Sequence, residues 1–283
     1  MSLPREELLF LGGGRITSAI VEGLWRAKFK GAIAVYDRHL RKLKKLESEF
    51  GVSGARDLAS AVGNASILVI AVRPKSVNGL LEGLARHCRP TGHRMTTGVR
   101  HGNPRTPLAI SLAAGIPLSQ LRLRLGPPIC WARAMPSPAC RSGRGLTALA
   151  FAPGFPRSAR NRVRHLFGGL GMVAEIAENK FDVFTAAYSV SHGYHALAAL
   201  SLAAVKLGLD QRTAEISAAH ALADGILSWR GKRTKLSELL REAATPGGIA
   251  EAVLKSEEQA GYSRIVLRAL RAGVSRAQSL RGR

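Results

Sequence analysis

The sequence predicts an α/β fold, in which a parallel sheet covered by helices comes first and an all-helical domain follows. Two observations support this prediction. Short apolar runs alternate with amphipathic stretches in the first half of the chain, which is typical of βαβ units. From Phe181 onward, Ala/Leu-rich segments with helical spacing replace the strand pattern. We therefore expect one domain over residues 1–178 and a helical domain over residues 179–283.

The expected elements of the first domain follow one another in regular order. Strands are predicted at residues 8–11, 32–36, 67–71, 108–112, 129–134, 146–151 and 172–176. Helices are predicted at residues 16–27 and 39–50, after Pro74, and at residues 157–170. Residues 88–107 are rich in Gly, Pro, Thr and Arg, so they are expected to form an exposed loop.

The helices of the second domain are too apolar for an isolated domain. Segments such as 196–207 and 213–229 are hydrophobic around much of their circumference, and such helices have to be buried on several sides. Roughly 100 residues of helix cannot bury that much surface alone. We expect an interface with another subunit, in a homodimer or a higher homo-oligomer.

Composition excludes several classes of protein. The 283 residues are 46% hydrophobic, enough for a substantial core, so a disordered chain is excluded. No stretch has the roughly 18 uninterrupted apolar residues of a membrane span, and the N-terminus does not resemble a signal peptide. We expect a cytoplasmic protein with no membrane partner. The cysteines Cys88, Cys130 and Cys140 have no CxxC spacing, so no metal site is expected.

The strongly basic composition allows phosphorylated ligands or nucleic acid. Formal net charge is +23, from 42 Lys and Arg residues against 19 Asp and Glu residues. The excess is mostly arginine, is spread over the chain, and lacks the interleaved aromatic residues of a single-strand platform. We therefore expect no nucleic-acid partner.

A glycine-rich turn carries the main functional signal. Gly12, Gly13 and Gly14 follow the first predicted strand and precede a helix, where glycine lets a pyrophosphate approach the helix N-terminus. Asp37 and Arg38 follow the second strand. An acidic residue at this place accepts hydrogen bonds from the ribose of NAD, whereas an arginine pairs with the extra phosphate of NADP. The sequence therefore predicts a nicotinamide dinucleotide and leaves NAD or NADP open.

Six ordered segments extend this reading to the whole chain: FLGGGRITSAIVEGL, ILVIAVRPKSV, AISLAAGIPLSQL, RAMPSPA, FDVFTA and TPGGIAEAVL. In order and approximate spacing they resemble the pyrroline-5-carboxylate reductase family. The resemblance implies a Rossmann-type dinucleotide-binding domain followed by an all-α dimerisation domain. It also implies NAD(P)H-dependent reduction of 1-pyrroline-5-carboxylate to L-proline, a step of proline biosynthesis, and a homodimer with interleaved helical domains.

The resemblance also implies which residues bind. The expected cofactor-binding residues are Gly12, Gly13, Gly14, Arg15, Ile16, Asp37, Arg38, Ala71, Val72, Arg73, Pro74, Ala113, Ala114 and Gly115. The expected substrate-binding residues are Glu178, Ser189, Thr245, Gly247 and Gly248. No catalytic residue is assigned, although His192 or His195 could serve as an acid if they do not simply pack at an interface.

Several substrate-side segments depart from the family pattern. This chain has MPSPA in place of MPNTPA, which is one residue longer, YSVSHGY in place of the family's small Gly and Ser positions, and GGIA in place of GGTT. Arg73 replaces the family's usual lysine. Two alternatives to pyrroline-5-carboxylate reduction, or reduction of a related cyclic imine, therefore stay open. One is an oxidoreductase of the same fold acting on another small substrate. The other is a non-catalytic dinucleotide-binding paralogue.

Overall fold

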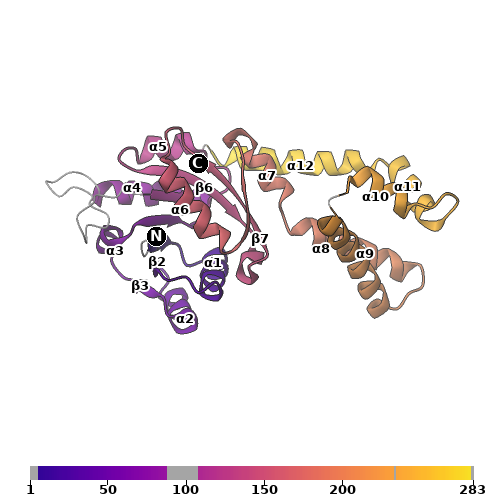
Figure 1. The fold of residues 1–283 in the computed structure, drawn as a ribbon, viewed down its shortest axis with the longest axis horizontal. Helices are drawn as coiled ribbons and strands as arrows, with labels where there is room; N and C mark the ends of the chain where they lie inside the picture. Colours follow the sequence, from indigo (N-terminus) through magenta and orange to yellow (C-terminus); the bar gives the residue numbers. More distant parts are fainter. Residues whose placement is uncertain (1–5, 88–107, 233, 282–283) are drawn as a thin grey trace. The chain divides into compact units, whose positions relative to one another are not determined.

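The computed structural model describes residues 6–87, 108–232 and 234–281. The described chain forms two compact units (Figure 1). The first contains residues 1–187 and 273–283, and the second contains residues 188–272. The boundary expected between residues 178 and 179 differs from this division and stays a prediction. The sequence-based expectation for residues 88–107 lies outside the described residues.

An eight-stranded sheet organises the first unit, in the order β3-β2-β1-β4-β5-β6-β7-β8. The neighbours are parallel except for the pair β6 and β7, which is antiparallel. Chain direction therefore reverses once across the sheet. The strands are β1 (Glu7–Leu11), β2 (Ala32–Tyr36), β3 (Ser53–Ala55), β4 (Ile67–Ile70), β5 (Leu108–Ser111), β6 (Cys130–Pro136), β7 (Gly145–Phe151) and β8 (Gly171–Glu175).

Helices cover both faces of this sheet because its strands alternate apolar side chains between two separate cores. α1, α2 and α6 bury side chains in the first core, and α3, α4 and α5 bury theirs in the second. The helices are α1 (Arg15–Arg26), α2 (Leu40–Phe50), α3 (Leu58–Asn64), α4 (Val77–His87), α5 (Leu118–Arg124), α6 (Arg157–Gly168) and α7 (Phe181–Ala187), with the 3₁₀ turns η1 (Pro74–Ser76), η2 (Pro138–Ser142) and η3 (Glu178–Lys180).

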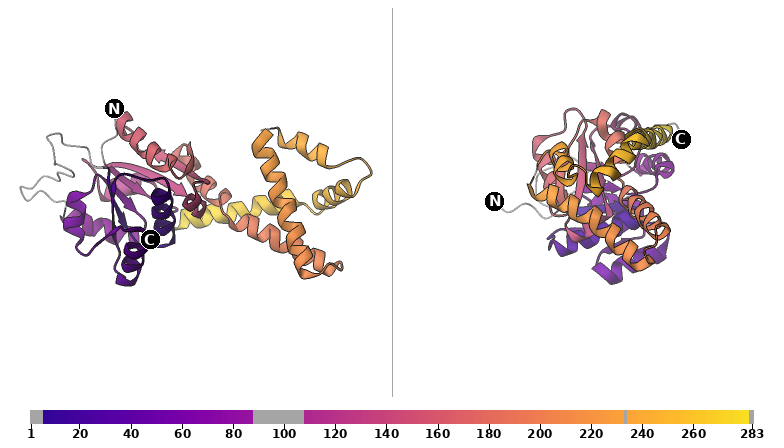
Figure 2. Two further views of the ribbon diagram at one scale, coloured as in Figure 1. Left: turned by 60° about the horizontal axis from the view of Figure 1, so that its bottom comes forward. Right: turned by 90° about the vertical axis from the view of Figure 1, so that its right-hand side faces the viewer.

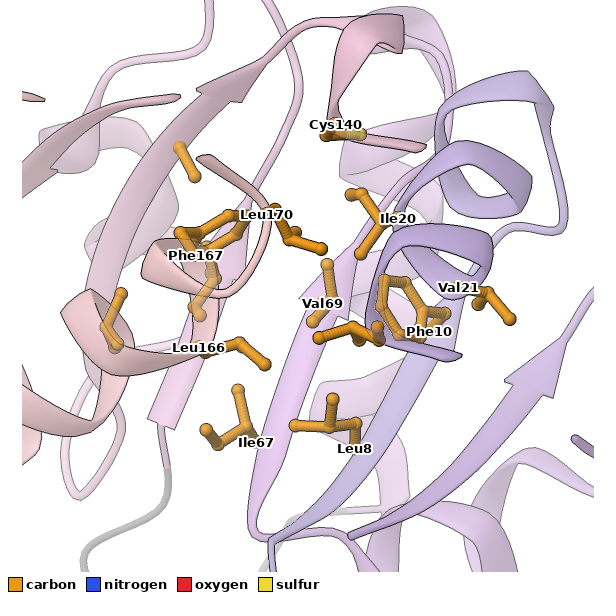
Figure 3. Packing of buried hydrophobic residues seen from close by; sticks show 14 of the residues in the cluster. Leu8, Phe10, Ile20, Val21, Ile67, Val69, Cys140, Leu166, Phe167 and Leu170 are labelled. Carbon is orange, nitrogen blue, oxygen red and sulfur yellow. The ribbon is translucent and has the colours of Figure 1, made fainter. Parts of the chain in front are cut away.

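The first core packs α1 against β1 and β4. Figure 3 shows Ile20 of α1 beside Phe10 of β1 and Val69 of β4, with Phe167 and Leu170 on the other side. Each of these side chains is at most 1% exposed. Full burial of such side chains contributes about 1.5–3 kcal/mol apiece, so the glycine turn before α1 rests on a well-packed element.

The second unit consists of helices in its described residues (Figure 2). They are α8 (Ser191–Lys206), α9 (Gln211–Lys232), α10 (Leu236–Ala243), α11 (Ile249–Gln259) and α12 (Tyr262–Ser279), whose last residues belong to the first unit. Large apolar side chains on these helices are exposed, including Leu202, Leu227 and Ile249. In the described part of the chain, no helix has the length and apolarity needed to cross a membrane.

The expected fold class is confirmed: a parallel α/β sheet is followed by a helical domain. The structure adds short elements that the sequence did not indicate, namely β3, α3 and α5. It also shows that β7 runs antiparallel to β6, although its apolar pattern is like that of the parallel strands. Strand direction depends on tertiary pairing, which local periodicity does not encode.

Candidate functional site

The candidate cofactor residues lie along the carboxyl ends of β1, β2, β4 and β5. β1 pairs with β2 on one side and with β4 on the other. The connection after β1 therefore leads to one side of β1, and the connection after β3 leads back to its other side. In open α/β sheets this point is where a crevice for ligands forms. The fold therefore brings together residues that are far apart in the sequence.

Gly12 occupies the tightest place in this arrangement. Its φ is +117°, and its N–H donates to the Tyr36 carbonyl at 2.8 Å. A Cβ at Gly12 would lie 2.7 Å from the carbonyl oxygen of Ala71. Thr17 Oγ1 donates to the Gly12 carbonyl from the first turn of α1. Only glycine fits a position where three strand ends approach one another so closely.

Gly14 leaves the N-terminus of α1 open. Gly14 is the N-cap residue, no side chain caps the helix, and a Cβ at Gly14 would have no neighbour within 4 Å. The first turn of α1 contains no acidic residue. Free N–H groups and the helix dipole at such an end favour an anion. The turn containing Gly12, Gly13 and Gly14, with Arg15 and Ile16 in the first turn of α1, therefore fits the pyrophosphate of a dinucleotide.

Asp37, at the end of β2, accepts a hydrogen bond from this turn. Its Oδ2 accepts from the Gly13 N–H at 2.8 Å and lies 3.3 Å from Lys42 Nζ. Its Oδ1 accepts from the His39 N–H at 2.8 Å and lies 2.9 Å from His39 Nδ1. Burial alone would raise the pKa of Asp37, but these hydrogen bonds and the Lys42 charge lower it to about 2. Asp37 is therefore an ionised, fully engaged carboxylate.

The lowered pKa of Asp37 predicts a pH-dependent contribution to stability. The folded pKa of about 2 lies below the reference value of 3.8, so the stabilisation exists above pH 3.8 and disappears as the pH falls through 2. We expect Asp37→Asn to lower the free energy of unfolding by about 2 kcal/mol at neutral pH and by about half as much near pH 3. Urea unfolding at both pH values measures this.

The control for Asp37→Asn is Glu49→Gln, which removes a half-exposed carboxylate of α2 that pairs with Lys45 at 3.8 Å. That change should cost less than about 0.5 kcal/mol. An Asp37→Asn penalty that is the same at both pH values would contradict an ionised Asp37.

The ends of β4 and β5 supply the other candidate cofactor residues. The Ala71 N–H donates to the Leu11 carbonyl at 2.9 Å, and the segment Ala71, Val72, Arg73 and Pro74 continues into η1. The Leu112 N–H donates to the Ile70 carbonyl at 2.9 Å, which keeps the start of the next loop beside β4. In that loop Ala113 and Gly115 are buried and Ala114 is partly exposed. These backbone contacts place both segments at the edge occupied by Gly12.

The candidate substrate residues are divided between the two units. Glu178 belongs to the first unit, where its Oε1 accepts from the Leu118 N–H and from Arg133 Nη1, each at 2.9 Å. Ser189 lies in the second unit, with its Oγ 2.7 Å from Ser191 Oγ. Thr245, Gly247 and Gly248 form one exposed turn before α11, in which the Gly248 N–H donates to the Thr245 carbonyl at 2.8 Å. Their roles stay predictions.

Two groups of charged contacts were not predicted from the sequence, although Glu178 itself was a candidate substrate residue. In the turn before α11, the Gly247 N–H donates to Glu251 Oε2 at 2.8 Å, and Lys255 Nζ is 2.9 Å from Glu251 Oε1. In the first unit, Arg133 is buried beside Glu178 and Asp182. An arginine inside the apolar run of β6 was the visible signal for the second group. Glu251 had no such signal.

The chain is similar to known proteins over its full length. A pyrroline-5-carboxylate reductase of Corynebacterium melassecola is 26% identical over 273 residues, covering 95% of this chain and 97% of that protein. One of Pseudomonas aeruginosa is 27% identical and covers 99% and 98%. The structure of a pyrroline-5-carboxylate reductase from Coxiella burnetii has a TM-score of 0.84 at 25% identity, covering 98% of this chain and 99% of that one.

A more distant structure shares the fold alone. It is the Plasmodium falciparum pyrroline carboxylate reductase with NADP bound, with a TM-score of 0.82 at 19% identity and a coverage of 99% of both chains.

Two family models match separate parts of the chain. Residues 7–91 match the model described as NADP oxidoreductase coenzyme F420-dependent, and residues 178–280 match pyrroline-5-carboxylate reductase dimerisation. The glycine turn, the open α1 and Asp37 thus belong to an NAD(P)-binding oxidoreductase. With full-length likeness at about a quarter identity, the chain is a distant member of the pyrroline-5-carboxylate reductase family.

Proposed function

We propose that this protein reduces 1-pyrroline-5-carboxylate to L-proline, or reduces a closely related cyclic imine, with a reduced nicotinamide dinucleotide. The observation that carries the proposal is the geometry of the candidate cofactor residues at the carboxyl ends of β1, β2, β4 and β5. There Gly12 has a backbone conformation that favours glycine, and no side chain caps the N-terminus of α1. The full-length likeness to pyrroline-5-carboxylate reductases supports the substrate class.

This reaction requires little covalent chemistry from the protein. A bound reduced nicotinamide supplies the hydride, so the chain has to hold two molecules in contact and exclude water. The N–H groups at the start of α1 would bind the pyrophosphate, and the mostly buried segment from Ala113 to Gly115 would form one wall beside the nicotinamide. Thr245, Gly247 and Gly248 are the candidates for holding the substrate.

The direct experiment measures NADPH and NADH oxidation by the purified protein with 1-pyrroline-5-carboxylate, together with cofactor binding by titration. Turnover with proline as the product is the expected result. Cofactor binding without turnover would shift the function to another small substrate or to a non-catalytic paralogue. Absence of binding to either cofactor would overturn the proposal.

We further propose that NADPH is the preferred cofactor. The oxygens of Asp37 already accept from the backbone N–H groups of Gly13 and His39 and lie beside His39 Nδ1 and Lys42 Nζ. A ribose hydroxyl would have to compete with these donors. Arg38, His39 and Lys42 are exposed at the same strand end, which suits a 2′-phosphate.

This preference predicts a selective effect at Arg38. Arg38→Ala should weaken NADPH binding about tenfold, the effect of losing one charge-assisted contact, and should leave NADH binding unchanged. Fluorescence titration with both cofactors measures the difference. The control is Arg26→Ala, which removes an equal charge at the opposite end of α1, where Arg26 pairs with Glu22 at 3.2 Å. Equal loss for both cofactors in Arg38→Ala would reject the phosphate contact.

Glu251 favours a second candidate, an imine without a carboxylate. Its carboxylate accepts the N–H of Gly247, one of the candidates for holding the substrate, and thus places a negative charge on that turn. The Lys255 side chain, followed by the Gly247 N–H, lowers the pKa of Glu251, so this charge is present at neutral pH. A carboxylate on the substrate would be repelled there.

The two substrates can be separated by one substitution. We expect Glu251→Ala to raise kcat/KM for 1-pyrroline-5-carboxylate about threefold or more relative to kcat/KM for uncharged 1-pyrroline, a modest electrostatic effect. Glu257→Ala removes an exposed charge farther along the same helix and should leave the ratio unchanged. An unaltered ratio in Glu251→Ala would show that Glu251 does not influence substrate choice.

A further inference from the structure

A partly buried cluster of charged side chains lies outside the candidate cofactor residues. Arg133 of β6 has a side chain that is 2% exposed, and the Asp182 side chain of α7 is 7% exposed. Arg133 Nη1 donates to Glu178 Oε1 at 2.9 Å, and Arg133 Nη2 is 3.8 Å from Asp182 Oδ1. Arg281 Nη2 donates to Asp182 Oδ2 from beyond the end of α12. Two positive and two negative groups thus balance one another in this cluster, which belongs entirely to the first unit.

This cluster is attached to the loop between β5 and α5. Besides its bond with Arg133, Glu178 Oε1 accepts the N–H of Leu118, the first residue of α5, at 2.9 Å. The Arg133 guanidinium also lies over the Phe181 ring, 4.1 Å from its centroid. Because Arg133 is fixed from two sides, it fixes the Glu178 carboxylate that holds the end of the loop.

The end of α12 contacts the same loop at a second point. Gly115 has a φ of +75°, and a Cβ there would lie 2.2 Å from the Ala277 carbonyl oxygen and 3.0 Å from Leu280 Cβ. The loop backbone therefore packs directly on the helix that leads to Arg281. The Arg281–Asp182 ion pair attaches that end of the chain to α7.

The cluster has unused hydrogen-bonding capacity. Arg133 Nε and Nη2, Glu178 Oε2 and Asp182 Oδ1 are buried and have no hydrogen-bond partner among the described residues. A buried network that is only partly satisfied depends strongly on each remaining contact. Without Arg281, Asp182 would retain Arg133 as its ion-pair partner in the described chain. Attraction to Asp182 would then draw Arg133 away from Glu178 and loosen Leu118.

We propose that Asp182 and Arg281 are positioning residues for residues 113–118, acting through Arg133, Glu178 and the contact between Gly115 and Ala277. The described ion pairs of Asp182 and Arg281 are with each other and with Arg133, not with candidate cofactor residues. The significance for catalysis rests on the proposed function, in which this loop forms the wall beside the nicotinamide. The positioning of residues 113–118 by Asp182 and Arg281 does not depend on the proposed function.

The test compares Arg281→Ala with Arg276→Ala in the full-length protein. Arg276 lies near the end of the same helix, and its described side-chain hydrogen bond is to Ser279 Oγ. Hydrogen exchange of residues 112–118 without cofactor is the first readout, and NADPH titration is the second. We expect Arg281→Ala alone to accelerate exchange of the Leu118 amide and to weaken NADPH binding about fivefold. Arg281→Lys, which keeps the charge, should restore most of both properties.

The two readouts separate failure of this inference from failure of the proposed function. Unchanged exchange of Leu118 in both Arg281→Ala and Asp182→Asn would overturn the positioning role, whether or not the protein binds NADPH. Faster exchange in a protein whose wild type binds no NADPH would support the positioning of the loop while overturning the proposed cofactor.

Discussion

Replacing Gly12 with alanine is expected to abolish NADPH binding and to lower the free energy of unfolding by about 3 kcal/mol, from backbone strain and overpacking together. The new Cβ would lie 2.7 Å from the Ala71 carbonyl oxygen and 2.9 Å from its carbon, at a φ of +117°. These are backbone atoms of β4's end, which cannot rotate away as a side chain would. The strand ends would have to separate, and the turn over α1 would move with them.

Gly14→Ala is the matched control for the Gly12 variant. Gly14 has a φ of −83°, which alanine adopts readily, and its Cβ would meet no atom within 4 Å. Its free energy of unfolding should stay within about 0.5 kcal/mol of wild type. Weaker NADPH binding without lost stability would place the pyrophosphate against Gly14. Thermal unfolding and titration measure both variants, and a Gly12→Ala protein with wild-type values would contradict the close approach of the strands.

Arg133→Met is expected to lower the free energy of unfolding by about 3–5 kcal/mol, since it removes the shared partner of two carboxylates and leaves them inside the first unit. Methionine retains much of the side-chain volume and the contact with Phe181, so lost packing contributes little. The loss in free energy of unfolding therefore measures the effect of removing the Arg133 charge. Urea unfolding measures it.

The Arg133 variant has two informative controls. Arg164→Met removes an exposed arginine that pairs with Glu175 at 3.0 Å, and it should cost less than about 1 kcal/mol. Adding Glu178→Gln and Asp182→Asn to Arg133→Met should recover part of the loss, because the two carboxylate charges that Arg133 compensated are then removed as well. A triple variant less stable than the single one would mean that the two carboxylates are stabilised by groups other than Arg133.

The cofactor edge was predictable because its signals are local. Gly12, Gly13 and Gly14 stand between a strand and a helix within a few residues, and Asp37 follows the adjacent strand, so a repeating βαβ pattern suffices to place them together. α3 and α5 were missed for the opposite reason. Each has 7 residues, too few turns for an apolar periodicity to stand out from its surroundings.

The charged cluster could not be predicted because its contacts are distant in sequence. Arg133 and Glu178 are 45 positions apart, and Arg281 and Asp182 are 99 apart. Pairing over such distances is decided by how helices and strands pack, whereas local spacing shows only that a charge interrupts an apolar strand. Glu251 is a different case. It is close to Gly247 in sequence, but a glutamate in the first turn of a helix is common and reveals no competition with a ligand.

Because α12 begins in the helical unit and its last residues belong to the first, the helical unit is an insertion within the first unit's chain. During synthesis, the sheet and its helices emerge well before the residues that complete them. Asp182 can pair with Arg281, and Gly115 can pack against Ala277, only after the whole helical unit has been synthesised. Until α12 has been synthesised, the nascent first unit therefore has an Asp182 carboxylate without its Arg281 partner and a loop without its contact to α12.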